Sequence, residues 1–185
     1  MRLDKFLANM GVGTRSEVKQ LLKKGSVKVN QNIVKLPKLH VNPNSDEIMV
    51  NDEVVSYIDK VYIMLNKPKG YISATEDEVH PTIIDLIPEY AHLNIFPVGR
   101  LDKDTEGLLL VTNDGQFNHE VMNPNKHVSK TYEVYSKHPI TQFDIDKFKS
   151  GIELSDGKLK PAILKKVDDY LSHVTIYEGK YHQVK

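Results

Sequence analysis

The sequence predicts an α+β protein of two domains: a small basic domain with a helix pair and a hairpin, then a mixed, mostly antiparallel sheet domain. The first observation is charge. Residues 1–40 hold nine Lys or Arg and two acidic residues, and the other 145 hold sixteen and twenty-three, so the two parts carry +7 and −7. The second is the run of short apolar segments after residue 60, which predicts more strands than helices. We place the domains at 1–58 and 59–185, with a polar, acidic junction over 51–59.

The composition excludes several kinds of site. The 185 residues include no cysteine, which rules out disulfides and thiolate zinc sites within this sequence. No apolar run has the length of a signal peptide or a membrane span, so we expect a cytoplasmic protein without a membrane partner. A basic module of this size is typical of binding to nucleic-acid phosphates, although a solvated Lys-rich face remains the alternative.

The basic domain begins with two predicted helices. Apolar residues recur at helical spacing over residues 2–10, and Gly11-Val12-Gly13 ends that helix. Thr14 and Glu17 then match a capping box, which starts a second helix that runs to about Lys24. Gly25 supplies the stop signal.

The second helix has one apolar and one cationic face. Arg15, Lys19 and Lys23 are four residues apart, so they stack along one side and form a surface suited to an RNA backbone. Apolar residues on either side of Asn30-Gln31-Asn32 predict a small hairpin, and residues 48–50 continue the strand pattern.

The second domain consists mainly of predicted strands. Residues 61–65 have the pattern of a buried strand, residues 66–70 of a turn, and residues 82–87 of a short helical segment that ends before Pro88. Asn113-Asp114-Gly115 indicates a turn, and Thr141 caps a helix that ends near Gly151. The remaining expected strands are 95–98, 107–112, 131–135, 159–167 and 171–177.

The segment from Gly99 to Leu110 carries the clearest chemistry. Asp102, Asp104 and Glu106 alternate next to an apolar strand, and Arg100 is close enough in sequence to hold Asp102 ionised. Three interpretations are about equally supported by the local residues alone. They are an exposed acidic turn, an oxygen-ligand metal site, and a catalytic carboxylate. The spacing does not match a calcium-binding loop, and the sequence has no glycine-rich phosphate cradle.

Residues 1–48 resemble the small RNA-binding domain first seen in ribosomal protein S-four. The resemblance rests on three segments: Arg2-Leu3-Asp4-Lys5-Phe6-Leu7, Thr14-Arg15-Ser16-Glu17 and Gly25-Ser26-Val27-Lys28-Val29-Asn30. In that family the helix pair binds RNA. The resemblance therefore implies RNA contacts for Arg15, Lys19 and Lys23, and we expect Arg2 and Lys5 to bind RNA as well.

The remainder is similar to bacterial ribosomal pseudouridine synthases, most closely to the small-subunit RsuA type. The segment from Gly99 to Gly115 is similar to the catalytic motif of that family. Three further segments follow the family order: residues 62–71, which pack behind the catalytic loop in the family, Lys130-Thr131-Tyr132, and residues 178–185. This likeness favours the catalytic interpretation of the carboxylates.

The resemblance implies a role for each matching residue. Asp102 is expected to be the essential carboxylate, with Arg100 beside it to hold RNA or the flipped nucleotide. Tyr132 is expected to lie against the uracil, and Lys185 to face Asp102 as a cation. Taken alone, Tyr132 is more typical of a core residue, and His182 of a structural one.

The expected reaction converts one uridine of 16S ribosomal RNA to pseudouridine. It is an isomerisation, so no metal and no other cofactor is expected, and ribosomal RNA or an assembling small subunit is the expected partner. The alternative is a non-catalytic RNA-binding or ribosome-assembly protein with the same fold. The family pattern continues beyond residue 185, so we also expect a catalytic domain that is truncated at its carboxyl end.

Overall fold

The computed structural model describes residues 1–154, 157–179 and 183. Contacts between Cα atoms divide the chain into two compact units, Met1–Asp114 and Gly115–Lys185. The predicted domain boundary at residues 58 and 59 lies inside the first unit and stays a prediction.

The basic domain begins with the two predicted helices, α1 (Leu3–Asn9) and α2 (Arg15–Lys24). The capping box is present, because the Thr14 hydroxyl accepts from the Glu17 amide and the Glu17 carboxylate accepts from the Thr14 amide. Gly25 ends α2 in the left-handed conformation with φ of 77°. The caps read from the sequence are therefore confirmed.

A four-stranded antiparallel sheet completes this domain in the order β2-β1-β3-β4. Its strands are β1 (Val27–Val29), β2 (Asn32–Ile33), β3 (Ile48–Val50) and β4 (Glu53–Val54). The prediction that the segment after residue 50 is only a junction is wrong for β4. Two polar residues in left-handed conformations, Asn51 and Asp52, turn the chain so that β4 pairs with β3.

One apolar core joins these helices to the sheet. Helix α1 contributes Phe6, α2 contributes Leu22 and β1 contributes Val27, all almost completely buried. The Phe6 ring also stacks on Tyr57, with ring centroids 5.9 Å apart. Residue 57 therefore packs against the basic domain.

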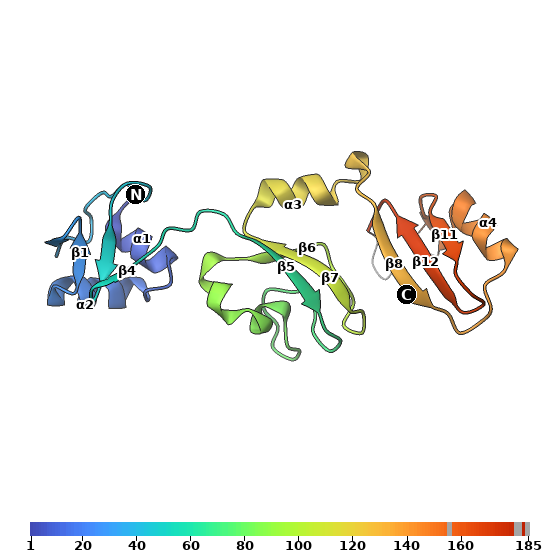
Figure 1. Cartoon of the computed structure of the whole chain (residues 1–185), viewed down its shortest axis with the longest axis horizontal. Coiled ribbons are helices and arrows are strands. Elements are labelled where there is room, and N and C mark those ends of the chain that lie inside the picture. The colour runs from blue at the N-terminus through green and yellow to red at the C-terminus, as the bar shows by residue number, and fades with distance from the viewer. Residues whose placement is uncertain (155–156, 180–182, 184–185) are drawn as a thin grey trace. The chain divides into compact units, whose positions relative to one another are not determined.

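The first unit contains a second sheet, with the order β5-β7-β6 and antiparallel pairing throughout (Figure 1). Its strands are β5 (Tyr62–Lys67), β6 (Phe96–Val98) and β7 (Gly107–Thr112). One face packs on the short 3-10 helices η1 (Ile83–Leu86) and η2 (Pro88–Leu93). The helical segment predicted over 82–87 is thus a 3-10 helix, and the loop between β6 and β7 holds Asp102.

The second unit has a three-stranded antiparallel sheet, β11-β12-β8, with helix α4 against it (Figure 1). The predicted helix cap at Thr141 is confirmed by a capping box with Asp144. Helix α3 is missing from the sequence prediction, because the turn signal Asn113-Asp114-Gly115 overlaps its first residue, Gly115. The elements are α3 (Gly115–Met122), η3 (Pro124–Lys126), β8 (Lys130–Tyr135), α4 (Gln142–Ser150), β9 (Glu153–Leu154), β10 (Gly157–Lys158), β11 (Ile163–Lys166) and β12 (Leu171–Ile176).

The α+β class with mostly antiparallel sheets is confirmed. Every named strand pair is antiparallel, and an isolated bridge between Ile72 and Thr82 is parallel. In the described part of the chain, no helix has the length and apolar character to cross a membrane.

Candidate active site and RNA-binding surface

The loop that holds Asp102 joins two neighbouring strands. Strand β7 is central in its sheet and alternates between a buried and an outer face, with Leu109 and Val111 in the core. Gly99 begins the loop at φ of 82°, and Gly107 ends it at φ of 125°, conformations that favour glycine. The loop between them has no strand partner, so its backbone polar groups need other partners.

Lys67 supplies those partners from the end of β5. Its side chain is fully buried, and its ammonium donates to the carbonyl oxygens of Thr105 at 2.7 Å and Lys103 at 3.5 Å. A third hydrogen bond goes to the Pro68 carbonyl at 3.0 Å. A charged donor that binds two carbonyls of one loop fixes the loop against the strand.

The carboxylates of the loop lie within electrostatic reach of this ammonium. Burial lowers the pKa of Lys67, and the nearby Asp104, Asp102 and Glu106 act in the opposite direction. Asp102 is half-buried, whereas Asp104 and Glu106 are exposed. The three alternating carboxylates therefore occupy different environments, with Asp102 the most enclosed.

A second anchor is the buried side chain of Ser73. Its hydroxyl donates to the Leu101 carbonyl at 2.8 Å and accepts from the Leu101 amide at 2.9 Å, next to Asp102. The Gly70 amide donates to the Lys103 carbonyl at 2.7 Å. Residues 67–73 therefore form hydrogen bonds with the backbone on both sides of Asp102. The family resemblance places this segment behind the loop, but nothing in the sequence pattern distinguishes Lys67 or Ser73 from surface residues.

Tyr132 lies on β8 in the second unit, directly opposite Val174 of β12. It is half-buried and packs against the apolar core formed with Val174 and Ile176. Asp102 belongs to the first unit, Met1–Asp114. The predicted Lys185, and His182 with it, lie outside the described residues.

RNA binding by the predicted basic residues stays a prediction, but the structure shows which of their side chains face solvent. The side chains of Arg15, Lys19 and Lys23 are exposed on α2, and Lys5 on α1 and Arg100 in the loop are also exposed. Arg2 instead forms an ion pair with Asp4. Its guanidinium donates two hydrogen bonds to the Asp4 carboxylate, with Nη2 2.6 Å from Oδ2. That hydrogen bond holds the pKa of the buried Asp4 carboxyl below its usual value, against the effect of burial.

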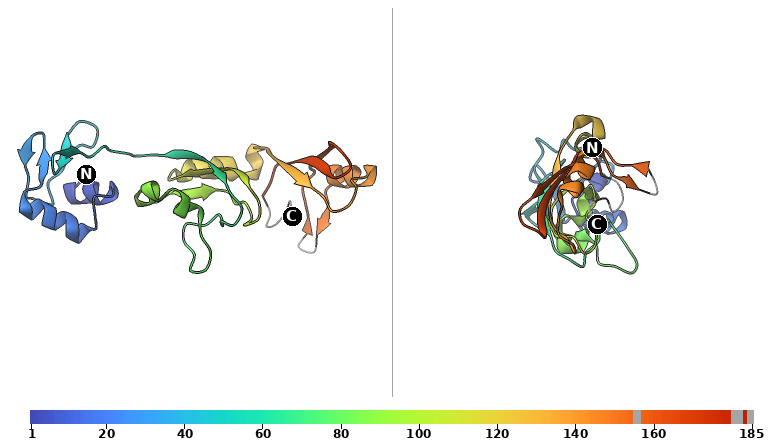
Figure 2. Two further views of the ribbon diagram at one scale, coloured as in Figure 1. Left: turned by 60° about the horizontal axis from the view of Figure 1, so that its bottom comes forward. Right: turned by 90° about the vertical axis from the view of Figure 1, so that its right-hand side faces the viewer.

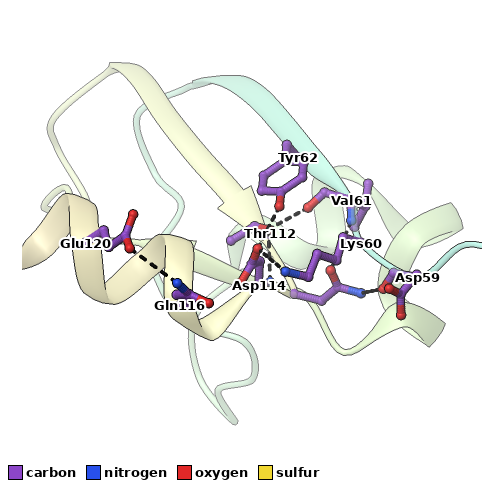
Figure 3. A network of polar contacts seen from close by, with 9 residues as sticks. Asp59, Lys60, Val61, Tyr62, Thr112, Asp114, Gln116 and Glu120 are labelled. Atoms are coloured by element: carbon purple, nitrogen blue, oxygen red, sulfur yellow. Dashed lines mark hydrogen bonds and ion pairs between the residues drawn. The ribbon is translucent and has the colours of Figure 1, made fainter.

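A polar network ties the segment before β5 to the end of β7 (Figure 3). The Asp114 carboxylate accepts from the Lys60 ammonium at 2.7 Å and from the Tyr62 hydroxyl at 2.6 Å. The Thr112 hydroxyl donates to the Val61 carbonyl and accepts from the Asp114 amide. Beyond its predicted role in a turn, Asp114 thus fixes the point at which the chain enters the sheet.

Among the described residues, no group of three or more His, Asp or Glu side chains is arranged to hold a metal ion. The loop thus holds one half-buried carboxylate, Asp102, on a backbone fixed by Lys67 and Ser73, with an exposed arginine two residues before it. Such a site suits acid–base or nucleophilic chemistry.

Comparison with known families decides between the kinds of enzyme. Residues 61–185 match the model of the RNA pseudouridylate synthase family, and residues 1–48 match the S4 domain. The chain belongs to the RNA pseudouridylate synthase family. This synthase accordingly carries an S4 domain at its amino end, as the resemblance implied, and it is an enzyme that isomerises uridine in RNA.

Individual relatives agree with this assignment. An uncharacterized RNA pseudouridine synthase, YtzG, from Bacillus subtilis is 49% identical to the synthase, and the alignment covers all of this chain and 80% of the relative. Ribosomal small subunit pseudouridine synthase A of Haemophilus influenzae is 40% identical, over all of this chain and 81% of that protein. Ribosomal large subunit pseudouridine synthase B of Bacillus subtilis is 37% identical, over all of this chain and 78% of that protein.

The fold is also found in a solved structure. A crystal structure of a pseudouridylate synthase superposes with a TM-score of 0.64 at 38% sequence identity, over all of this chain and 80% of that one. The synthase fold predicted by resemblance is therefore confirmed.

Proposed function

We propose that this synthase converts one uridine of 16S ribosomal RNA to pseudouridine, with Asp102 as the essential carboxylate. The proposal rests on the hydrogen bonds that fix the backbone around Asp102. A buried lysine and a buried serine hold the backbone on both sides of it. A group that must act on a flipped nucleotide needs such fixed geometry.

The small subunit is favoured by the names of relatives at 35–40% identity, which are small-subunit synthases from several bacteria. The large-subunit relative at 37% identity makes 23S ribosomal RNA the competing substrate. Ribosomal RNA of either kind agrees with an S4 domain at residues 1–48.

The other site residues take the roles that the family resemblance implies. Arg100 holds RNA beside Asp102, Tyr132 lies against the uracil, and Lys185 faces the carboxylate. Arg15, Lys19 and Lys23 bind the RNA backbone from helix α2, with Lys5 and Arg2 at its edge. In this proposal residues 1–58 are the RNA-binding domain, residues 59–185 are the catalytic domain, and no cofactor takes part.

The test is tritium release from ribosomal RNA labelled at uracil carbon five, with a chelator present. We expect release from 16S RNA by the wild type, and a rate at least about a thousand-fold lower for Asp102→Asn, since a catalytic carboxylate is lost. Asp104→Asn is the matched control, because it removes an exposed carboxylate of the same loop.

Three outcomes contradict parts of the proposal. Release from 23S but not 16S RNA reassigns the substrate. Equal rates for Asp102→Asn and Asp104→Asn remove the role of Asp102. RNA binding without any release favours the non-catalytic alternative for this chain.

A further inference from the structure

The long segment between β5 and η1 forms a loop whose base is attached to the catalytic loop (Figure 2). The Ile72 amide donates to the Pro81 carbonyl at 3.0 Å, and the Ile83 amide donates to the Ile72 carbonyl at 3.1 Å. Ser73, next to Ile72, is the residue that binds Leu101. Hydrogen bonds therefore connect the two ends of this loop to the backbone next to Asp102.

A second contact lies nearer the apex of the same loop. The Lys103 ammonium is 3.4 Å from Nδ1 of His80, within hydrogen-bonding distance. Lys103 directly follows Asp102 in the catalytic loop. Residues 76–80, here called the apex, thus contact the loop that holds Asp102 at a second point, through His80 and Lys103.

The conformation of the apex is set before any substrate arrives. The Asp77 carboxylate accepts from the Val79 amide at 2.9 Å and from the His80 amide at 2.7 Å. These hydrogen bonds lower the pKa of Asp77, so the turn is complete at neutral pH. A preset turn presents its side chains without a large entropy cost on binding.

The apex exposes one apolar side chain, that of Val79, next to three carboxylates. Val79 is 81% exposed, more than the other large exposed apolar side chains of the described residues. Glu76, Asp77 and Glu78 are exposed beside it. Carboxylates repel phosphates within about 8–10 Å at ordinary salt, whereas the faces of bases are neutral and apolar. RNA therefore approaches this apex most favourably with an unpaired base toward Val79.

We propose that residues 76–80 are a specificity-determining element, in which Val79 packs on an unpaired base next to the target uridine and the carboxylates exclude the phosphates of duplex RNA. This inference rests on the RNA-modifying function proposed above. In this element Val79 attracts an unpaired base of the substrate RNA, and the carboxylates repel duplex RNA that is not a substrate.

The first experiment measures single-turnover tritium release by Val79→Ser. We expect kcat/KM to fall about five-fold, as for the loss of a small apolar contact in the transition state. Val167→Ser is the matched control, because Val167 is also exposed, at 51%, beside two aspartates in a turn of the second unit. An RNA that lacks the neighbouring base should remove the difference between Val79→Ser and the wild type. Equal rates for Val79→Ser and the wild type on intact RNA overturn the proposal.

The second experiment tests the repulsion with the double variant Glu76→Gln/Glu78→Gln. We expect unrelated duplex RNA to inhibit this variant at about three- to ten-fold lower concentration than the wild type at low salt, with a smaller gap at high salt. Glu89→Gln/Glu153→Gln removes two exposed carboxylates elsewhere and should leave the inhibition unchanged. Identical inhibition of both double variants contradicts the repulsive role.

A third measurement separates this inference from the proposed function. A photo-reactive benzoylphenylalanine at position 79, compared with the same residue at position 167, reports RNA contact without any chemistry. Cross-linking at position 79 alone supports the apex even if 16S RNA is not the substrate or Asp102 is not essential. Equal or absent cross-linking at both positions overturns the apex contact, whatever the tritium assay shows.

Discussion

The amino-terminal core around Phe6 and the loop around Asp102 are stabilised by different forces. Apolar side chains from α1, α2 and β1 meet in the amino-terminal core, and standard caps end its helices. The Asp102 loop has no strand partner and is held by polar side chains, Lys67 and Ser73, that bind its backbone carbonyls. The first region is therefore stabilised mainly by apolar packing. The second is a loop whose backbone geometry depends on a few hydrogen bonds.

The largest expected effect on stability is in the amino-terminal core. Leu7→Ala should destabilise this region by about 3 kcal/mol, because Leu7 is fully buried and its loss leaves a cavity. Chemical denaturation measures this change, and the exposed Leu36→Ala is the control. The rate of the reaction at saturating RNA should stay close to that of the wild type. A large fall in this rate would show that the Asp102 loop depends on the amino-terminal core.

Lys67→Met should have the largest effect on the loop that holds Asp102. Two loop carbonyls lose their donor in a buried site, so we expect a loss of about 2 kcal/mol and a rate at saturating RNA at least about ten-fold lower. The exposed Lys69→Met serves as the control. A variant that loses stability but keeps the wild-type rate contradicts a positioning role for Lys67.

The same lysine predicts a pH dependence. Its folded pKa is lowered, so between the folded and unfolded pKa values the unfolded chain binds more protons and the free energy of unfolding rises with pH. The stability difference between the wild type and Lys67→Met should therefore change in favour of the wild type in the alkaline range below the usual lysine pKa. Denaturation at several pH values measures it, and a flat difference rules out the lowered pKa.

Ser73→Ala should have a smaller effect, of about 1 kcal/mol, because the reciprocal hydrogen bonds with Leu101 are lost. The rate at saturating RNA should fall by several-fold while RNA affinity stays the same. Ser45→Ala, at an exposed serine in the amino-terminal domain, is the control. A change in affinity alone would place the effect of Ser73 in RNA binding instead.

Asp4→Asn should give the smallest change in stability, and it tests a polar contact in the amino-terminal domain. It removes the ion pair with Arg2, and we expect the melting temperature to fall by about 2–5 °C at neutral pH. The folded pKa of Asp4 is lowered, so its stabilisation is present above the usual carboxyl pKa and is lost as pH falls. A difference from the wild type that persists at strongly acidic pH contradicts this origin.

The amino-terminal domain was largely predictable because its signals are local. Thr14, Glu17 and Gly25 specify a helix within a dozen residues, and the alternation around Asn30 specifies a hairpin. The structure has all of these elements. The strand β4 was missed because its pairing depends on a turn at Asn51 and Asp52, whose left-handed conformations leave little trace in the sequence.

The sequence by itself determined the fold class, the cationic side of α2 and the family resemblance of the segment around Asp102. Periodicity, caps and motif spacing are properties of neighbours along the chain. Only the tertiary structure decided that Lys67 and Ser73 brace the loop, that Asp4 engages Arg2, and that His80 lies beside Lys103. A buried lysine that binds carbonyls 36 and 38 residues away cannot be told from a surface lysine by its neighbours. Burial and long-range hydrogen bonds arise when distant segments fold together, and they give the Asp102 loop its shape.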